Sequence, residues 1–235
     1  QGSKHRVTTN GRAGFYLYAQ SRHRSAYDRD GDGYTDLPTL DNKTLGLSTF
    51  LRLTDYSKVT LKYHGLKEFR RGGNNLFLPP HEANIAEQIE HTINGGSLAY
   101  DLFNPNGKGH FSAYASFQNV DRKSYYGGLG ELASAAEGQK ALNEAYKLGL
   151  SLDMSEEDAA KLPDDQQEIL ANAQAYDKAQ RAYNVTHNIN YIAGAQYVHN
   201  FDRLLFMPAD LTVGAEYSFD RIKDRSLGYN SLLEQ

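Results

Sequence analysis

The segment with the clearest chemical signature is acidic: Asp28-Arg29-Asp30-Gly31-Asp32-Gly33-Tyr34-Thr35-Asp36. Its carboxylates recur at every second position, and calcium prefers such oxygen ligands. Gly33 stands where the sharp turn of a calcium loop requires glycine. We therefore predict one structural calcium ion. Its predicted ligands are Asp28, Asp30, Asp32, the Tyr34 carbonyl, Asp36 and, from the far side of the loop, Asp41.

This segment differs from an EF-hand in two respects. Thr39 stands where the bidentate glutamate is required, and the flanking sequences have the alternation of strands rather than the spacing of helices. The alternative is an acidic turn that uses aspartate and glycine only for their backbone geometry.

A second group of chemically capable residues is His81, Glu82 and His91, which a zinc or haem site would use. Their spacing is unspecific. The favoured interpretation is a helix over Ala83 to Glu90 that begins after Pro80 and packs Ile85 and Ile89 onto a sheet.

Composition narrows the function classes. The 235 residues include no cysteine, which excludes disulfides, thiolate catalysis and cysteine zinc sites. No Ser/His/Asp or paired-carboxylate arrangement stands out, so we do not expect an enzyme. The net charge of −4 and the scattered basic residues give no nucleic-acid footprint.

Around these segments the chain alternates apolar and polar residues, which is typical of strands with one apolar and one polar face. Their lengths reach or approach the roughly 9–11 residues that a tilted strand needs to cross a bilayer. The seven predicted strands are roughly Gly14 to Ser25, Thr44 to Thr54, Lys58 to Arg70, Ser97 to Phe103, Lys108 to Asp121, Asn188 to Asn200 and Leu211 to Ile222.

The connections between these strands are sorted by length. Short ones (55–57, 104–107 and 202–210) alternate with long ones (27–43, 71–94 and 122–186). A transmembrane barrel has one rim of short turns and one of long loops. We therefore predict an all-β fold: about seven strands of a larger transmembrane, antiparallel, up-and-down β-barrel with long outward loops.

The alternation also predicts which side chains face lipid and which face the lumen. Tyrosines suit the two interfaces of such a barrel. The predicted lipid-facing residues are Leu45, Leu47, Leu51, Leu53, Phe111, Phe117, Val213 and Phe219. The predicted lumenal residues are Lys58, Lys62, His64, Asp101 and Glu216. The predicted interfacial tyrosines are Tyr16, Tyr18, Tyr63, Tyr191, Tyr197 and Tyr217.

The third long loop carries a helical insertion over 131–183, rich in Ala, Glu, Gln and Lys. Ser155-Glu156-Glu157-Asp158 opens one helix as a capping box, Pro163 ends it, and Gln166 to Tyr183 form another. Apart from this insertion, residues 1–235 are expected to be one partial barrel domain. Seven strands cannot close a barrel, and the chain starts beside one strand and ends at Ser231 to Gln235 in a loop. We therefore expect an internal slice of a larger barrel.

The order of these elements resembles the TonB-dependent outer-membrane receptors. The likeness rests on the segment Tyr27 to Tyr34, the alternating strand from Leu45 to Arg52, the short turn and long strand that follow, and the strand exits Glu68 to Asn74 and Asp121 to Gly128. It is greatest to the vitamin B12 receptor branch, whose members bind calcium at such aspartates in outward loops, and in style to Bacteroides-type receptors.

The resemblance implies a barrel of about 22 strands around a plugged lumen. It implies energised uptake, across the cell outer membrane, of a scarce metal chelate: cobalamin, a ferric siderophore or haem. The implied partners are that chelate, a TonB-type energy-coupling protein, the lipid bilayer and a surface-exposed binding lipoprotein, without nucleic acid. Phe77, Tyr125 and Tyr126 in the long loops are the expected ligand contacts, because aromatic side chains offer broad, low-entropy surfaces.

Two other classes stay open at this point. One is a soluble, calcium-stabilised β-sandwich that acts as a binding or adhesin module. The other is a passive porin or a surface enzyme built on a smaller barrel.

Overall fold

The computed structural model describes residues 1–226, which form one eight-stranded antiparallel sheet with strands in chain order. The expected loop at residues 231–235 lies outside this range. The strands are β1 (Gly2–Val7), β2 (Ala13–Arg24), β3 (Thr39–Arg52), β4 (Ser57–Gly73), β5 (Ala86–Phe103), β6 (Gly109–Gly127), β7 (Tyr183–Leu204) and β8 (Met207–Ser226).

The prediction of seven strands was one short. The missed strand, β1, pairs with β2 from Gly2↔Ala19 to Val7↔Gly14. Its sequence is mainly polar and shows little alternation, so only its pairing with β2 reveals it. The other seven strands contain most of the predicted runs and extend several of them at the long-loop end, where polar residues continue the hydrogen-bond ladder.

The predicted helix over residues 83–90 is wrong. Only a short 3₁₀ turn, η1 (Pro80–Glu82), follows Pro79, and Ala83 is already extended. From Ala86 onward the chain is paired on both sides, with β4 and with β6. Pairing with two long neighbours outweighs the weak helical spacing of this segment.

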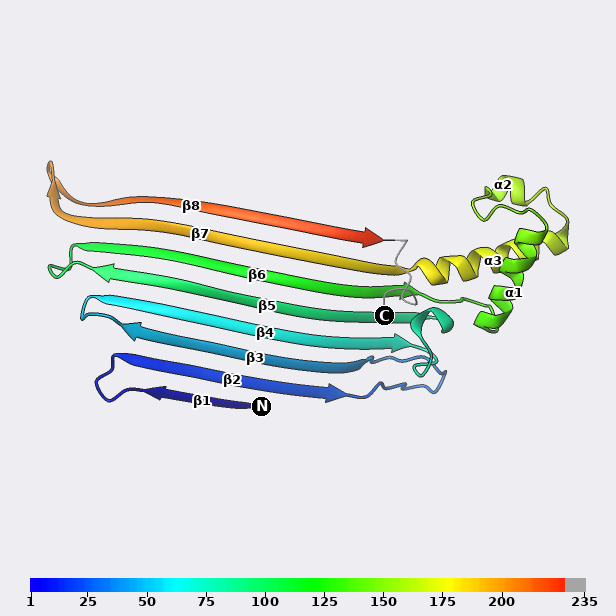
Figure 1. Cartoon of the computed structure of the whole chain (residues 1–235), viewed down its shortest axis with the longest axis horizontal. Coiled ribbons are helices and arrows are strands. Elements are labelled where there is room, and N and C mark those ends of the chain that lie inside the picture. The colour runs from blue at the N-terminus through cyan, green and yellow to red at the C-terminus, as the bar shows by residue number, and fades with distance from the viewer. Residues whose placement is uncertain (227–235) are drawn as a thin grey trace.

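Figure 1 shows the sorting of the connections by length. The tight connections (residues 8–12, 53–56, 104–108 and 205–206) gather at one end of the sheet, and the long ones (25–38, 74–85 and 128–182) at the other. The tight connection before β8 is shorter than expected, because β7 and β8 extend into the predicted turn region. We call the second end the long-loop rim.

The strand register separates the two faces of the sheet. One face carries Leu17, Leu47, Tyr63, Gly96, Phe117, Tyr191 and Phe219 as a single row of cross-strand neighbours. The other carries rows such as Ser48–Lys62–Ser97–Ser116. We call these the apolar face and the polar face. The predicted lumenal residues Lys58, Lys62, His64, Asp101 and Glu216 all lie on the polar face.

Aromatic residues mark two levels of the apolar face. Tyr63, Phe117, Tyr191 and Phe219 belong to the row nearer the long-loop rim. Tyr100, Phe111 and Tyr197 lie nearer the tight turns, and the rings of Tyr100 and Phe111 meet at 6.4 Å between centroids. Phe111 and Phe117 are six residues apart on β6, which is about 20 Å along a strand. The side chains between the two levels are mainly Leu, Val and Ala.

Three predicted interfacial tyrosines lie elsewhere. Tyr217 is on the apolar face, but its register row, with Ala193 and Ala115, lies between the two aromatic levels. Tyr16 and Tyr18 are on the polar face, opposite Leu17, with their ring centroids 5.9 Å apart. The Tyr18 ring lies over Gly46, where an added Cβ would come within 2.0 Å of it. Tyr18 therefore fills space above a glycine.

The apolar side chains in the middle of the sheet are not part of a buried core. Leu51 is 48 % exposed, and Leu17, Leu45, Leu61, Leu98, Phe117 and Val213 are similarly open. Among the described residues there is one sheet, and the buried apolar clusters all lie at the long-loop rim or in the helical insertion. The β-sandwich alternative requires a second sheet over these residues, and residues 1–226 contain none.

The insertion between β6 and β7 contains α1 (Ala135–Lys147), α2 (Glu156–Ala159) and α3 (Asp164–Arg181), and α1 was not predicted. Ser155 caps α2 by accepting the Asp158 N–H at 3.2 Å, which confirms the predicted cap. α3 begins directly after Pro163, and the chain enters β7 at Tyr183 rather than continuing the helix. Ala141, Ala145, Leu170 and Ala173 form the small core between α1 and α3.

Candidate functional site

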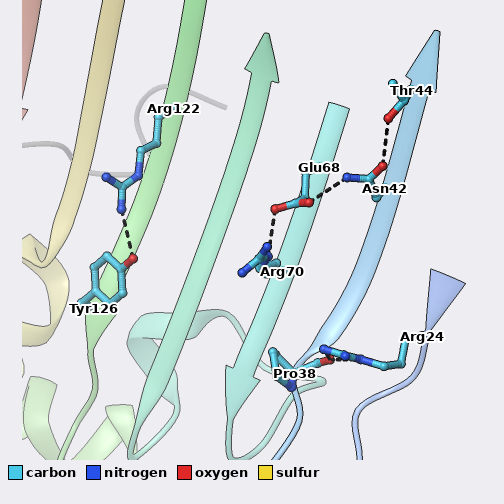
Figure 2. A network of polar contacts seen from close by, with 8 residues as sticks. All are labelled: Arg24, Pro38, Asn42, Thr44, Glu68, Arg70, Arg122 and Tyr126. Atoms are coloured by element: carbon cyan, nitrogen blue, oxygen red, sulfur yellow. Dashed lines mark hydrogen bonds and ion pairs between the residues drawn. The ribbon is translucent and has the colours of Figure 1, made fainter. Parts of the chain in front are cut away.

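The acidic segment forms the first long loop, and its base is held at two points. Tyr27 and Leu37 exchange two backbone hydrogen bonds of 3.0 Å. Arg24, at the end of β2, donates from Nη2 to the Pro38 carbonyl at 3.1 Å (Figure 2). These contacts close a loop of about ten residues on a fixed base, so its carboxylates are brought close together.

Three carboxylates converge in this loop. Ligand oxygens of Asp28, Asp30 and Asp36 all lie within 4.8 Å of one another. The Asp28 carboxylate accepts backbone N–H groups of Gly31 at 2.8 Å and Gly33 at 2.9 Å. Both glycines have positive φ (75° and 88°), which only glycine adopts without strain. The hydrogen bond from Gly31, followed by that from Gly33, lowers the pKa of Asp28 below its usual value of 3.8.

Two of the predicted calcium ligands are not in this group. Asp32 Oδ1 accepts the Tyr34 N–H at 2.8 Å, and so closes a local turn. Asp41 lies on β3, where its Oδ1 is 2.6 Å from Nδ1 of His23 on β2. The structure therefore places three of the predicted carboxylates together and directs the other two to different partners.

The zinc or haem site that the histidines could have formed is not assembled in the structure. His81 Nδ1 lies 2.8 Å from the Tyr183 hydroxyl, and burial lowers the pKa of His81. His91 is on the polar face of β5, in register with Glu68 and Arg122. Among residues 1–226, the acidic triad is the one group of three or more His, Asp or Glu side chains with metal-ligand geometry.

The three long loops surround a common cavity of about 700 Å³ at the rim. Tyr34 and Thr35 from the first loop, Asn84 and Ile85 from the second, and Lys178 and Ala179 from α3 line it, together with the end of β6. Its size is within the range of small-molecule sites, about 300–1,000 Å³.

Asn84 ties these loops to one another. Its Nδ2 donates to the carbonyls of Gly130 at 2.9 Å and Leu132 at 3.0 Å, and its Oδ1 accepts from Asn74 at 2.9 Å. Thr35 Oγ1 accepts the Gly73 N–H at 2.9 Å, which joins the acidic loop to the end of β4. The cavity walls are therefore cross-linked rather than independent.

The three expected ligand-contact residues are in three different environments. Tyr126 lines the shared cavity, and its hydroxyl accepts from Arg122 Nη2 at 3.0 Å on the polar face (Figure 2). Phe77 is 85 % exposed but lines a different cavity, on the apolar side. Tyr125 is next to Tyr126 on the strand, so its side chain points to the opposite face. There it is 1 % exposed, in a cluster with Ala83, Ala86 and Tyr183. The expectation of an open contact surface at Tyr125 is therefore corrected.

A polar network on the same face was not singled out from the sequence. Asn42 Nδ2 donates to Glu68 Oε2 at 2.7 Å, and Glu68 Oε1 is 2.8 Å from Arg70 Nε (Figure 2). Arg122 lies in the same register row, two strands away, and its buried Nε has no partner among the described residues. Side chains alternate between the two faces along each strand. Counting positions from the apolar residues of each strand would therefore have predicted that these side chains share one face.

Comparison with known proteins adds no relative: neither a family model, nor a curated protein, nor a solved structure matches the chain. Within residues 1–226, none of the helices combines the length and the apolar character needed to cross a bilayer.

Proposed function

We propose that this chain forms part of the wall of an outer-membrane β-barrel receptor that takes up a metal chelate with energy supplied through TonB. The observation that carries the proposal is the apolar face. It is a continuous band of exposed Leu, Val and Ala between two aromatic levels, on strands of 12–22 residues from β2 to β8. An apolar band about 25 Å tall with aromatic girdles is what a bilayer requires of a barrel exterior.

The sorted connections support the same proposal. In this account the tight turns face the periplasm and the three long loops face outward, where the ligand arrives. The shared cavity at the long-loop rim is then the capture site, with Tyr34, Tyr126 and Lys178 among the residues that touch the chelate.

The ligand atoms that the acidic loop offers are of the kind that calcium prefers. Asp28, Asp30 and Asp36 offer oxygen atoms alone, which suits a hard cation. Three carboxylates at this separation repel one another unless a proton or a cation lies among them. In the proposed role, the ion orders the loop that carries Tyr34 to the cavity, so less entropy is lost when the chelate binds.

Uptake is the direct test of this function. Cells that produce the protein should accumulate labelled cobalamin or a labelled ferric chelate, and the accumulation should stop when TonB is deleted. Tyr126→Ala should weaken capture several-fold, whereas Tyr146→Ala, an exposed tyrosine on α1 outside the cavity lining, should not. Uptake that is equal with and without TonB would refute the receptor and favour the passive porin.

A further inference from the structure

Arg71 is a buried cation without an acidic partner. Arg71 belongs to β4 and is 4 % exposed. No carboxylate among residues 1–226 forms an ion pair with it. A guanidinium keeps its charge at any physiological pH. Burying a charge is costly unless an opposite charge or several hydrogen bonds compensate for it.

The protein compensates this charge only in part. Arg71 Nη1 donates to the Gly72 carbonyl at 2.9 Å, and Nη2 donates to the Leu78 carbonyl at 3.5 Å. These bonds engage two of the five N–H groups of the side chain.

A cavity of about 500 Å³ adjoins this side chain. Its floor is the register row Thr39–Arg71–Gln88 on β3, β4 and β5, which continues to Tyr183 on β7. Its cover is the second long loop, which contributes mainly apolar side chains. The lining contains no carboxylate.

The second basic group in this lining is His81, which is 3 % exposed and bonded to the Tyr183 hydroxyl. Burial lowers the pKa of His81, and the Glu82 carboxylate, with Oε1 3.9 Å from His81 Nε2, opposes this with a smaller effect. Arg71 therefore supplies the permanent positive charge of the lining. Phe77, with most of its surface exposed, leaves part of the wall open to solvent.

We propose that this cavity binds an oxyanion, a phosphate or carboxylate group carried on an apolar body, with Arg71 as its counter-charge. The guanidinium matches such groups with two parallel N–H donors. Gln88 and Thr39 stand on either side of Arg71 in the same row. Gln88 Nε2 donates to Glu90 Oε1 at 3.2 Å, which leaves one of its two N–H groups for the ligand, and the Thr39 hydroxyl offers another hydrogen bond. The apolar cover accommodates the rest of the ligand.

This site is distinct from the proposed chelate site. It lies on the apolar face, eight residues beyond Tyr63 along β4, whereas the shared cavity is framed by the three long loops. In a barrel it would open to the outside of the wall, so its ligand would come from the medium or from the headgroup of a neighbouring lipid. The inference does not depend on transport.

The test is calorimetric titration of the full-length protein with four probes: butyl phosphate, inorganic phosphate, dihexanoyl phosphatidic acid and butanol. Butyl phosphate should bind, inorganic phosphate more weakly, and butanol not at all. Arg71→Gln should weaken butyl phosphate binding at least tenfold. Arg70→Gln should leave it unchanged, because Arg70 is on the opposite face beside Glu68. Tighter binding of the phosphatidic acid than of butyl phosphate would assign the site to a lipid headgroup, and the reverse order to a soluble anion.

Two results would overturn the proposal. One is equal binding of butyl phosphate by the Arg71→Gln and Arg70→Gln proteins; the other is no difference between butyl phosphate and butanol in the unaltered protein. If Arg71→Gln does not fold, a crystal of the unaltered protein soaked in butyl phosphate decides the matter. Phosphate density at the Arg71 guanidinium is expected, and its absence would contradict the site.

Discussion

At the residue scale, the acidic loop shows how identical side chains acquire different roles. Asp28 accepts two glycine N–H groups and, with Asp30 and Asp36, forms the cation-compatible triad. Asp32 closes a turn at the backbone of Tyr34. The sequence spacing identified the segment, but it could not separate these roles, because they depend on the φ angles of Gly31 and Gly33.

Calcium binding should therefore depend on one aspartate and not on its neighbour. We expect calorimetric titration to show one calcium site that Asp30→Asn removes and that Asp32→Asn weakens only slightly. The pair is matched, since each substitution removes one negative charge from the same exposed loop. Equal loss of binding in both variants, or an unaltered protein that binds no calcium, would count against the triad.

The lowered pKa of Asp28 predicts the acid behaviour of this loop. A carboxylate whose pKa falls on folding contributes stability above its unfolded pKa, and this stability is lost as the pH falls through the folded pKa. The hydrogen bonds from Gly31 and Gly33 should thus survive at pH 4 and weaken only below the usual value of 3.8. The amide proton shifts of these two glycines, followed by NMR during an acid titration, measure this. A midpoint above 4 would show that Asp28 is not held as described.

At the scale of elements, the alternation of side chains between the two faces of each strand decides which residues can meet. The alternation in the sequence correctly separated Leu45, Leu47 and Leu51 from Lys58 and Lys62. It failed for β1, whose residues are mainly polar, and for the start of β5, where partners distant in sequence determine the conformation. It also could not foresee that Tyr16 and Tyr18 lie on the polar face, because tyrosine suits both faces.

Because neighbouring side chains of β3 point to opposite faces, one strand offers a matched pair of substitutions. Leu51→Arg puts a charge on the apolar face, in the register row of Tyr100 near the tight turns. In a bilayer this should cost about 1–2 kcal/mol, between the roughly 2–4 kcal/mol of a midplane position and the roughly 0–1 kcal/mol of an interfacial one. Ser48→Arg puts the same charge on the polar face of the same strand and should cost little. Urea-induced unfolding of the two proteins in lipid vesicles measures the difference. Equal costs would argue against a lipid environment for Leu51.

The helical insertion should be separable from the sheet. α1 and α3 pack mainly on each other, through the cluster around Ala145 and Leu170. Replacing residues 133–182 with a short glycine linker should leave the β6–β7 ladder intact but remove the α3 wall of the shared cavity. We expect unchanged strand content by circular dichroism and weaker chelate capture by the cells. Loss of the sheet itself would show that the insertion is needed for folding.

At the scale of the whole molecule, sequence patterning was sufficient for the class of sheet and the sorting of its connections. It was insufficient for the shared cavity and the Arg71 cavity, because each joins segments far apart in the chain: Tyr34 with Ala179, and Arg71 with Tyr183. Our central proposal concerns the surroundings of the sheet: lipid contacts the apolar face, and water contacts the polar face.

The absence of cysteine from the chain makes this claim directly measurable. Single cysteines introduced from Thr44 to Arg52 on β3 can each be spin-labelled in the outer membrane or in vesicles. Collision rates with dissolved oxygen, which concentrates in lipid, and with a water-soluble nickel complex then report the surroundings of each label. We expect a period of two residues, with oxygen favoured at positions 45, 47, 49 and 51 and nickel favoured at 46, 48 and 50. Nickel access at all positions, or oxygen access at the polar positions instead, would contradict the barrel.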